Sequence, residues 1–293
     1  MTSPARGYGL VVLAAAFWAT LGLFYNTIID RYGLPPLTVV FFRGAVSSLV
    51  LFAILLPRHR SEVTLARRDW AFFLLFGLVG VAAFYAVYVY AIHLTGLAMA
   101  AVLMYTAPAW VALIAWRFMG ESFTRVKGLA LALTFSGTVL VARLFEPGQL
   151  QLNGLGILCG LGAGIGYALY SVGNRLALDR GYSPWAVVAW ANGLGALFLL
   201  PLQAPDVLLR AVTTPPAFAW LVVLGIVPTL GGAGCYVLGL RHLPVSVASV
   251  IATLEPVFAA LMGYVFLHEV LTPPQLAGGA LILAAVLLLR LRG

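Results

Sequence analysis

Residues 245–267 read VSVASVIATLEPVFAALMGYVFL, a run of 23 residues in which Glu255 is the single charged side chain. A helix that rises 1.5 Å per residue needs about 20 mostly apolar residues to cross the hydrocarbon core of a bilayer. This run is long enough to cross. We interpret it as a transmembrane helix with a glutamate about halfway along it and Pro256 directly after that glutamate.

The composition of the whole chain agrees with this interpretation. Hydrophobic residues make up 62% of the 293 residues and charged residues 9%, whereas soluble domains average about 45–50% and about 25%. So few charges would not cover the surface of a soluble globule of this size. The composition excludes a soluble enzyme, a nucleic-acid-binding domain and a secreted disulfide scaffold.

Nine further apolar runs flank the first one, separated by charged stretches or by stretches that contain Pro or Gly. The break at 93–96 is very short, but residues 70–116 are far too long for one crossing, so we expect a hairpin there. The sequence predicts an all-α integral membrane protein with ten transmembrane helices, at about residues 8–27, 35–56, 70–92, 96–116, 126–142, 153–177, 184–202, 217–240, 245–267 and 272–289.

The basic residues predict the orientation, because Lys and Arg are enriched in cytoplasmic loops. With the N-terminus inside, 13 of the 17 basic residues fall on the inner side and three on the outer side, and Arg43 lies within the second span. The net charge of +8 is then a topology signal. We expect a multi-pass protein of a bacterial inner membrane with both termini in the cytoplasm.

The two halves of the chain are similar to each other at an offset of about 148–150 residues. We expect a first five-helix repeat at residues 1–145 and a second at 150–293. Five crossings are an odd number, so the second repeat enters the membrane in the opposite direction. Inverted repeats are typical of secondary transporters, whose substrate site lies near the midplane between the repeats. The landmarks pair Trp70 with Trp220, Pro35 with Pro184, Pro108 with Pro256, and Gly120-Glu121 with His268-Glu269.

One motif points to a known family. The stretch LEPVFAALMGY at residues 254–264, followed by HEVLTPPQ at 268–275 and GGA at 278–280, resembles the closing segment of the EamA repeat. This repeat defines a large part of the drug/metabolite transporter superfamily. Residues 105–108 and 120–122 resemble a weaker copy that lacks the membrane glutamate, and Arg43 resembles the family's arginine in the second span. The resemblance implies ten helices in two inverted repeats around a central cavity, and export of small metabolites.

Glu255 and Arg43 are the charged residues well inside the predicted spans, and such residues are functional candidates by default. Glu255 could line the cavity, where it would meet a substrate amino group or carry a coupling proton, or it could bond to the helix bundle. Arg43 could bind a substrate carboxylate in a bidentate manner, pair with Glu255, cap backbone carbonyls or snorkel. The sequence leaves these alternatives open, and it fits both proton exchange and facilitated efflux.

Polar and aromatic residues recur at helical spacing in the first and sixth spans. Such faces suit a cavity between the repeats, because amphipathic aromatic rings can stack on a substrate and still form hydrogen bonds. For any single tyrosine, a hydrogen bond within the bundle is the simpler explanation. The candidate cavity residues beside Arg43 and Glu255 are Trp18, Tyr25 and Asn26; Tyr85, Tyr88 and Tyr105 of the third and fourth spans; and Tyr167, Tyr170 and Asn174.

Glycines and prolines mark positions of close packing or bending. Gly156, Gly160 and Gly164 are four residues apart on the sixth span, so they share a face that lets another helix approach. Pro228, Gly231 and Gly232 in the eighth span suit a kink, a hinge or a packing surface. Pro256 removes a backbone donor and can open the preceding helical turn.

The sequence lacks motifs for other chemistries. It holds no cofactor or metal signature and no phosphate-binding Gly-Lys-Ser/Thr loop, so we expect neither a cofactor nor ATP as the energy source. We predict a transporter and not an enzyme: an exporter of small metabolites, foremost aromatic or bulky neutral amino acids, that works by alternating access. Export of organic cations or other drug-like metabolites is the alternative. An intramembrane enzyme or a receptor-like binding protein is a more remote one.

Overall fold

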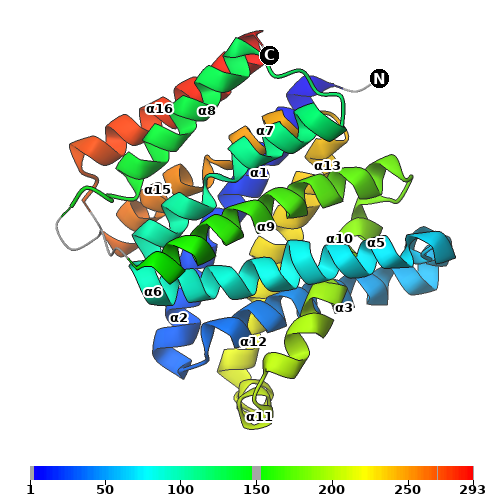
Figure 1. The fold of residues 1–293 in the computed structure, drawn as a ribbon. Coiled ribbons are helices and arrows are strands. Elements are labelled where there is room, and N and C mark those ends of the chain that lie inside the picture. The colour runs from blue at the N-terminus through cyan, green and yellow to red at the C-terminus, as the bar shows by residue number, and fades with distance from the viewer. Residues whose placement is uncertain (1–2, 147–152, 269, 293) are drawn as a thin grey trace.

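The computed structural model describes residues 3–146, 153–268 and 270–292, and over these residues the chain is a bundle of helices (Figure 1). The first half holds α1 (Pro4–Ala19), α2 (Leu21–Tyr32), α3 (Pro36–Arg58), α4 (Arg60–Val63), η1 (Arg67–Asp69), α5 (Trp70–Leu75), η2 (Phe76–Ala83), α6 (Phe84–Met104), α7 (Ala107–Phe118) and α8 (Arg125–Val141). The second half holds α9 (Gly154–Asp179), α10 (Pro184–Leu199), η3 (Leu200–Leu202), α11 (Pro205–Thr213), α12 (Pro215–Leu224), η4 (Gly225–Gly231), α13 (Gly232–Leu240), α14 (Val245–Ala252), α15 (Glu255–Leu267) and α16 (Pro273–Arg292).

The helices supply ten membrane crossings. Eight continuous helical segments of the described residues have at least 18 residues and are apolar enough to cross a membrane. One of them, Arg60–Phe118, is 59 residues long and turns back at Gly96, whose φ of 78° and ψ of 165° are not helical. Glycine adopts this left-handed conformation without strain. The second crossing of that segment and the 17-residue α8 complete the ten, so the predicted architecture is confirmed.

Two features recur in both halves at nearly the predicted offset. Both η2 and η4 are π-helical, and they begin at Phe76 and Gly225. Short turns also interrupt the fourth crossing at 105–106 and the ninth at 253–254. Neither the π-helices nor these turns follow from the hydrophobic pattern, because both leave the apolar run unbroken. The domain boundaries at 145 and 150 stay a prediction.

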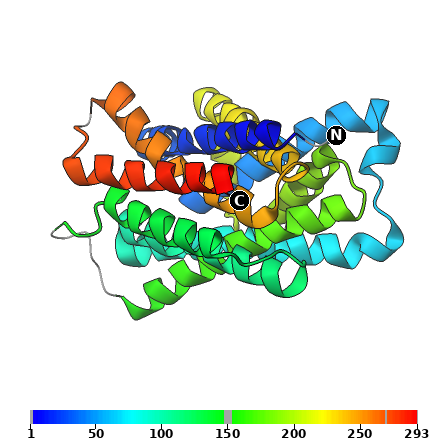
Figure 2. The ribbon, with the colours of Figure 1, turned by 90° about the horizontal axis from the view of Figure 1, so that it is seen from above.

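Helix pairs that join the two halves build the core. α6 packs against α9, α3 against α10, α1 against α13 and α8 against α16. The α8–α16 pair forms a flank at one side of the bundle, and Figure 2 shows these two helices side by side. Their contact is close: a Cβ built on Gly137 would lie 2.6 Å from the Gly278 carbonyl oxygen.

The helix ends differ from prediction in places. The predicted first span, 8–27, is two helices that meet at Thr20, whose hydroxyl donates to the Phe17 carbonyl at 2.7 Å. The amphipathic α11, which precedes the eighth crossing, lies outside the predicted spans. Of the predicted landmarks, Glu269 lies outside the described residues.

Candidate functional site

Arg43 is the cation at the centre of the bundle. Its side chain is buried, and it reaches from α3 to three other elements. Its Nε donates to Thr229 Oγ1 at 3.1 Å and its Nη1 to the Tyr25 hydroxyl at 3.4 Å. The guanidinium carbon lies 4.9 Å from the centre of the Tyr85 ring, within cation–π range. Arg43 is thus held by α2, α6 and η4.

The π-helix η4 orients the partner of Arg43. The Thr229 hydroxyl donates to the Leu224 carbonyl at 2.8 Å, five residues earlier. Because that proton is bonded to the last residue of α12, the hydroxyl oxygen is left as an acceptor for Arg43 Nε. Pro228 lies inside the same π-helix, where its missing N–H removes a ladder bond. The local helix distortion therefore positions a functional candidate.

Glu255 begins α15, directly after the turn at 253–254, and its side chain is partly exposed. Pro256 occupies a first-turn position, where a backbone N–H would have no acceptor within the helix, so the proline removes no helical hydrogen bond. The Glu255 carboxylate interacts electrostatically with Arg43 and with the Tyr105 hydroxyl. Among the ion pairs of the described residues, none joins it to Arg43. The two opposite charges thus share one site without direct contact.

Aromatic rings form the walls around these charges. Their centroids lie 4.5 Å apart for Phe84–Tyr85, 5.8 Å for Phe84–Tyr167 and 6.2 Å for Tyr167–Tyr170. Tyr88 interacts electrostatically with Glu255. We call the following set the central site: Trp18, Tyr25, Arg43, Tyr85, Tyr88, Tyr105, Tyr167, Tyr170 and Glu255.

Most of the predicted cavity residues belong to this set, with two differences. Asn26 is exposed on α2 and forms no part of it. Asn174 is fully buried one turn beyond Tyr170, and its Nδ2 donates to the Tyr170 carbonyl at 2.9 Å. Prediction missed Tyr236, which borders the central site, with its ring centroid 5.3 Å from that of Trp18. The repeat offset could have predicted Tyr236, because it stands 148 residues after Tyr88 and is therefore its counterpart in the second half.

The glycine row on α9 lies against the fourth crossing. A Cβ on Gly160 would lie 2.7 Å from Leu103 Cβ, and one on Gly164 would lie 2.9 Å from the Leu103 carbonyl oxygen. A Cβ on Gly156 would lie 2.8 Å from Leu94 Cβ, and a Cβ on Gly232 would lie 2.6 Å from Cδ1 of the Trp18 ring. Gly231, at the end of η4, has Phe17 in ordinary contact. These positions fit close packing beside the central site.

A polar network ties the helices together at one end of the bundle. We call this the basic end, which comprises the loops at 57–69, 117–125, 179–184 and 241–244. Glu121 accepts bonds from Lys127 Nζ at 3.2 Å and from the Val245 backbone N–H at 2.7 Å, and a short one from the Ser246 hydroxyl. The Arg175 Nη1 donates to the carbonyls of Leu240, at 2.9 Å, and Leu243. These bonds tie α8, α9 and the α7–α8 loop to the α13–α14 region.

A second contact at the basic end joins the two halves. The Tyr182 hydroxyl donates to Asp69 Oδ2 at 2.7 Å and accepts a bond from the Ala66 N–H at 3.1 Å. The Arg180 Nε lies 3.5 Å from Asp69 Oδ1. Burial raises the pKa of Tyr182, and so does the hydrogen bond to Asp69. The neutral phenol is therefore the stable form in this contact.

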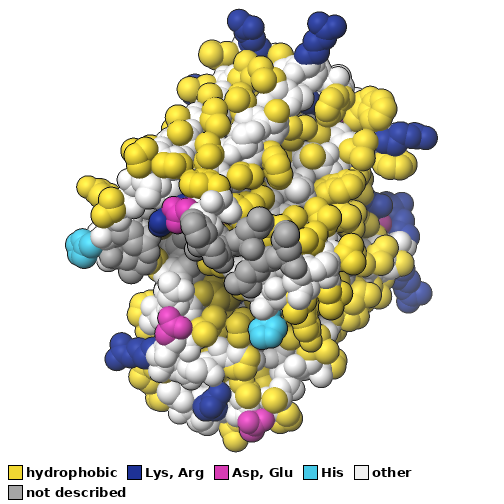
Figure 3. All heavy atoms as spheres, turned by 60° about the vertical axis from the view of Figure 1, so that its left-hand side comes forward, with side chains coloured by type: hydrophobic (Ala, Val, Ile, Leu, Met, Phe, Trp, Pro, Cys, Tyr) yellow, Lys and Arg dark blue, Asp and Glu magenta, His cyan; other side chains and the backbone are white. Residues whose placement is uncertain are grey.

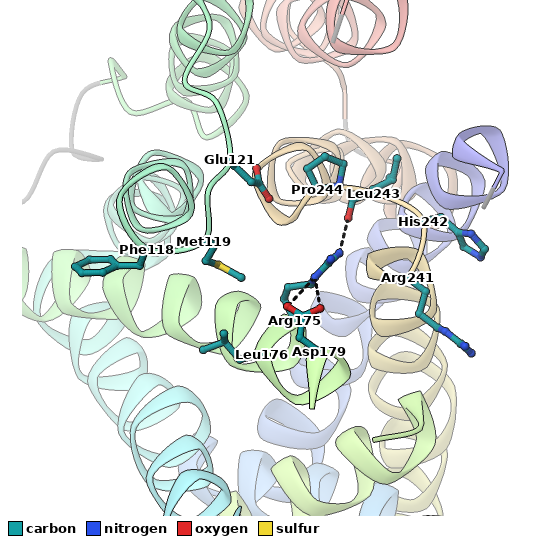
Figure 4. Close-up of a pocket in the computed structure, with 10 residues that line it drawn as sticks. All are labelled: Phe118, Met119, Glu121, Arg175, Leu176, Asp179, Arg241, His242, Leu243 and Pro244. Atoms are coloured by element: carbon teal, nitrogen blue, oxygen red, sulfur yellow. Dashed lines mark hydrogen bonds and ion pairs between the residues drawn. The ribbon is translucent and has the colours of Figure 1, made fainter. Parts of the chain in front are cut away.

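A pocket of about 500 Å³ opens at the basic end (Figure 4). Its residues come from the end of α7 and the α7–α8 loop, the end of α9 and the α13–α14 loop. In Figure 4 Arg175 lies at its centre, bonded to Asp179 and to the Leu243 carbonyl. The lining is Phe118, Met119, Glu121, Arg175, Leu176, Asp179, Arg241, His242, Leu243 and Pro244.

The opposite end is hollowed. Figure 3 looks onto this end and shows a recess with hydrophobic side chains inside it. The side chains of Tyr85, Tyr88, Tyr105 and Glu255 are partly exposed although they lie within the spans. The recess thus lies at the end opposite the basic end, where the polar network ties the helices together.

Comparisons with known proteins agree with this architecture. Residues 5–143 and 154–291 each match the EamA-like transporter family. A solved crystal structure whose chain is 19% identical aligns over 99% of this chain and 100% of its own, with a TM-score of 0.79, and shows the same fold.

Full-length relatives are named as transporters. An "Uncharacterized transporter" of Archaeoglobus fulgidus is 31% identical over 96% of this chain and 95% of its own. The "Uncharacterized inner membrane transporter YicL" of Salmonella typhimurium is 27% identical over 99% and 97%. The "Probable terminal-alkyne amino-acid exporter" of Streptantibioticus cattleyicolor is 27% identical over 96% and 92%.

Proposed function

Because the chain belongs to the EamA-like transporter family, we propose that it exports small metabolites, foremost amino acids with aromatic or bulky neutral side chains, by alternating access across the inner membrane. In this proposal both termini and the basic end face the cytoplasm, as the distribution of Lys and Arg indicates. The recess at the opposite end would then face outwards, which makes this conformation outward-facing in the proposal.

One observation carries the substrate proposal. Arg43 and Glu255 carry opposite charges in one aromatic-lined site, and no ion pair joins them. A zwitterion complements that arrangement: its carboxylate would bind the guanidinium and its ammonium the Glu255 carboxylate. The rings of Tyr85 and Tyr167 offer surfaces on which an apolar or aromatic side chain can stack. The name of the Streptantibioticus cattleyicolor relative points to the same substrate class.

The alternative substrate is an organic cation. Glu255 interacts electrostatically with Tyr88 and Tyr105, and tyrosine faces attract cations. In this case Glu255 would be the counter-charge, and the substrate would not need Arg43 as a ligand.

Purified protein in liposomes tests both substrates. Counterflow of L-phenylalanine and L-threonine would be compared with empty liposomes, and the absence of movement for both would refute amino-acid export. Arg43→Gln and Glu255→Gln then separate the alternatives. We expect either variant to abolish transport of a zwitterion. Transport of phenethylamine, a cation, should be lost with Glu255→Gln and retained with Arg43→Gln.

A further inference from the structure

A layer of buried polar side chains lies between the central site and the basic end. Ser171, Asn174 and Tyr236 are each 0% exposed. Ser171 Oγ, Asn174 Oδ1 and the Tyr236 hydroxyl have no hydrogen-bond partner of good geometry among the described groups. Buried polar groups are nearly always paired, and an unpaired one destabilises the fold. Three such atoms therefore lie together in one layer.

This polar layer is continuous with the central site. Ser171 and Asn174 lie one turn apart on the face of α9 that also carries Tyr167 and Tyr170. The Tyr236 hydroxyl, on α13, points at the Ser171 hydroxyl and interacts with it, without the geometry of a full hydrogen bond, and the Tyr236 ring centroid lies 6.4 Å from that of Tyr170. The Asn174 Nδ2 is already bonded to the Tyr170 carbonyl, so the free group of Asn174 is its acceptor oxygen.

On its other side the layer borders the pocket at the basic end. Ser171 lies four residues, or about 6 Å along the helix, from Arg175, which lines that pocket. Glu121 lines the same pocket, bonds to the start of α14 and interacts electrostatically with Tyr236. Along α9 the layer therefore lies between Tyr167 of the central site and Arg175 of the pocket.

The chemistry of the layer favours one class of ligand group. The Asn174 amide oxygen can only accept, each of the two hydroxyls can accept as well as donate, and a primary ammonium carries three N–H donors and no acceptor. The nearby charge of Glu121 is negative. The neighbouring cation, Arg175, is occupied by Asp179 and by two carbonyls. An anionic group would find no free cation among these residues.

We propose that Ser171, Asn174 and Tyr236 form a second binding position, which receives the primary ammonium group of a small substrate between the basic-end pocket and the central site once Glu121 releases α14. The position rests on the proposed function, because a route through the bundle exists only in a transporter. It would be the first position that a substrate meets during export.

Labelling of Ser171→Cys tests the route without a known substrate. Cys159 and Cys235, the native cysteines, would first be replaced by Ala. A membrane-impermeant methanethiosulfonate would be applied to inside-out and to right-side-out vesicles. We expect labelling from the cytoplasmic side alone, and labelling about tenfold faster with Glu121→Gln, which weakens charge-assisted bonds. Absence of labelling in both backgrounds, or labelling from the outside, would overturn the proposal.

Protection from labelling tests the ligand class. Phenethylamine carries an ammonium and no carboxylate, whereas 3-phenylpropionate carries a carboxylate and no ammonium. We expect phenethylamine to slow the labelling and 3-phenylpropionate to leave it unchanged. Equal protection by both, or by neither, would overturn the ammonium assignment. Failure of amino-acid counterflow would count against the proposed function alone, since the labelling does not depend on it.

Tyr236→Phe separates this role from a structural one. Loss of an unpaired hydroxyl should leave the melting temperature unchanged or raise it, while protection by phenethylamine weakens about tenfold. Tyr90→Phe, at a lipid-facing tyrosine that is 61% exposed, is the matched control and should change neither quantity. A lower melting temperature with unchanged protection would overturn the proposal.

Discussion

The Glu121 carboxylate accepts a hydrogen bond of 2.7 Å from the backbone N–H of Val245, the first residue of α14. A helix N-terminus leaves such N–H groups without a partner inside the helix, and its dipole favours a negative charge. Ser246 and Lys127 bind the same carboxylate. One side chain of the first half thus holds a helix of the second half at the basic end.

Replacement of Glu121 should loosen this contact. Glu121→Ala removes three bonds to a charged acceptor and leaves Lys127 without its partner, so we expect the melting temperature in detergent to fall by about 5 °C. Glu62→Ala is the control, since Glu62 forms an exposed contact with His59 at the same end, and such pairs contribute little. Equal shifts in the two variants would contradict the assigned role of Glu121.

Thr229 should influence transport through Arg43. Thr229→Val keeps the shape but removes the acceptor of Arg43 Nε, so the guanidinium loses one of its anchors. We expect kcat/KM for the transported substrate to fall about tenfold with little change in the amount of folded protein. Thr213→Val removes a comparable hydroxyl bond, to Leu209 on the exposed α11, and should have no effect on transport.

The sequence predicts the ten crossings well because lipid imposes a simple rule of length and apolarity. It also predicts the hairpin at Gly96, since no single helix could span that run. It predicts neither the π-helices nor the break at Thr20, because helix distortions inside an apolar run change hydrogen bonding and leave hydropathy unchanged. The pairing of Arg43 with Thr229 was hidden for the same reason, since it depends on the π-helix that carries Thr229.

The candidate site, too, could be predicted only in part from the sequence. Helical spacing grouped Tyr167, Tyr170 and Asn174 on one face, and α9 does present them on one face. Spacing within one helix does not report which helix lies opposite, so Tyr236 remained unrecognised as a neighbour of Trp18. The sequence also did not predict how deeply each asparagine is buried, because Asn174 is fully buried whereas Asn26 is exposed.

The contact that Tyr182 makes at the basic end should lose its stabilising effect at alkaline pH. Its pKa is raised by burial and by the bond to Asp69, so the neutral form stabilises the fold. This contribution is complete below the ordinary tyrosine pKa of about 10 and is lost as the pH rises through the raised value. We expect the wild type to melt about 2–4 °C above Tyr182→Phe near neutral pH. The difference should shrink above about pH 10, and a gap that stays constant to higher pH would argue against this contact.

The glycine row on α9 offers an internal comparison within one helix. A Cβ on Gly160 would lie 2.7 Å from Leu103 Cβ, whereas one on Gly162 would meet only Val87 Cγ2, at 3.9 Å. Gly160→Ala should therefore push α9 away from the fourth crossing, lower the melting temperature by several degrees and reduce transport. Gly162→Ala should instead stabilise the protein by about 0.5–1 kcal/mol, because Ala favours a helix over Gly. Both variants carry the same propensity gain, so the difference between their melting temperatures in one detergent isolates the packing of α9 against Leu103. If both variants were stabilised alike, the row would not be a packing surface, and the close approach of α9 beside the central site would need another cause.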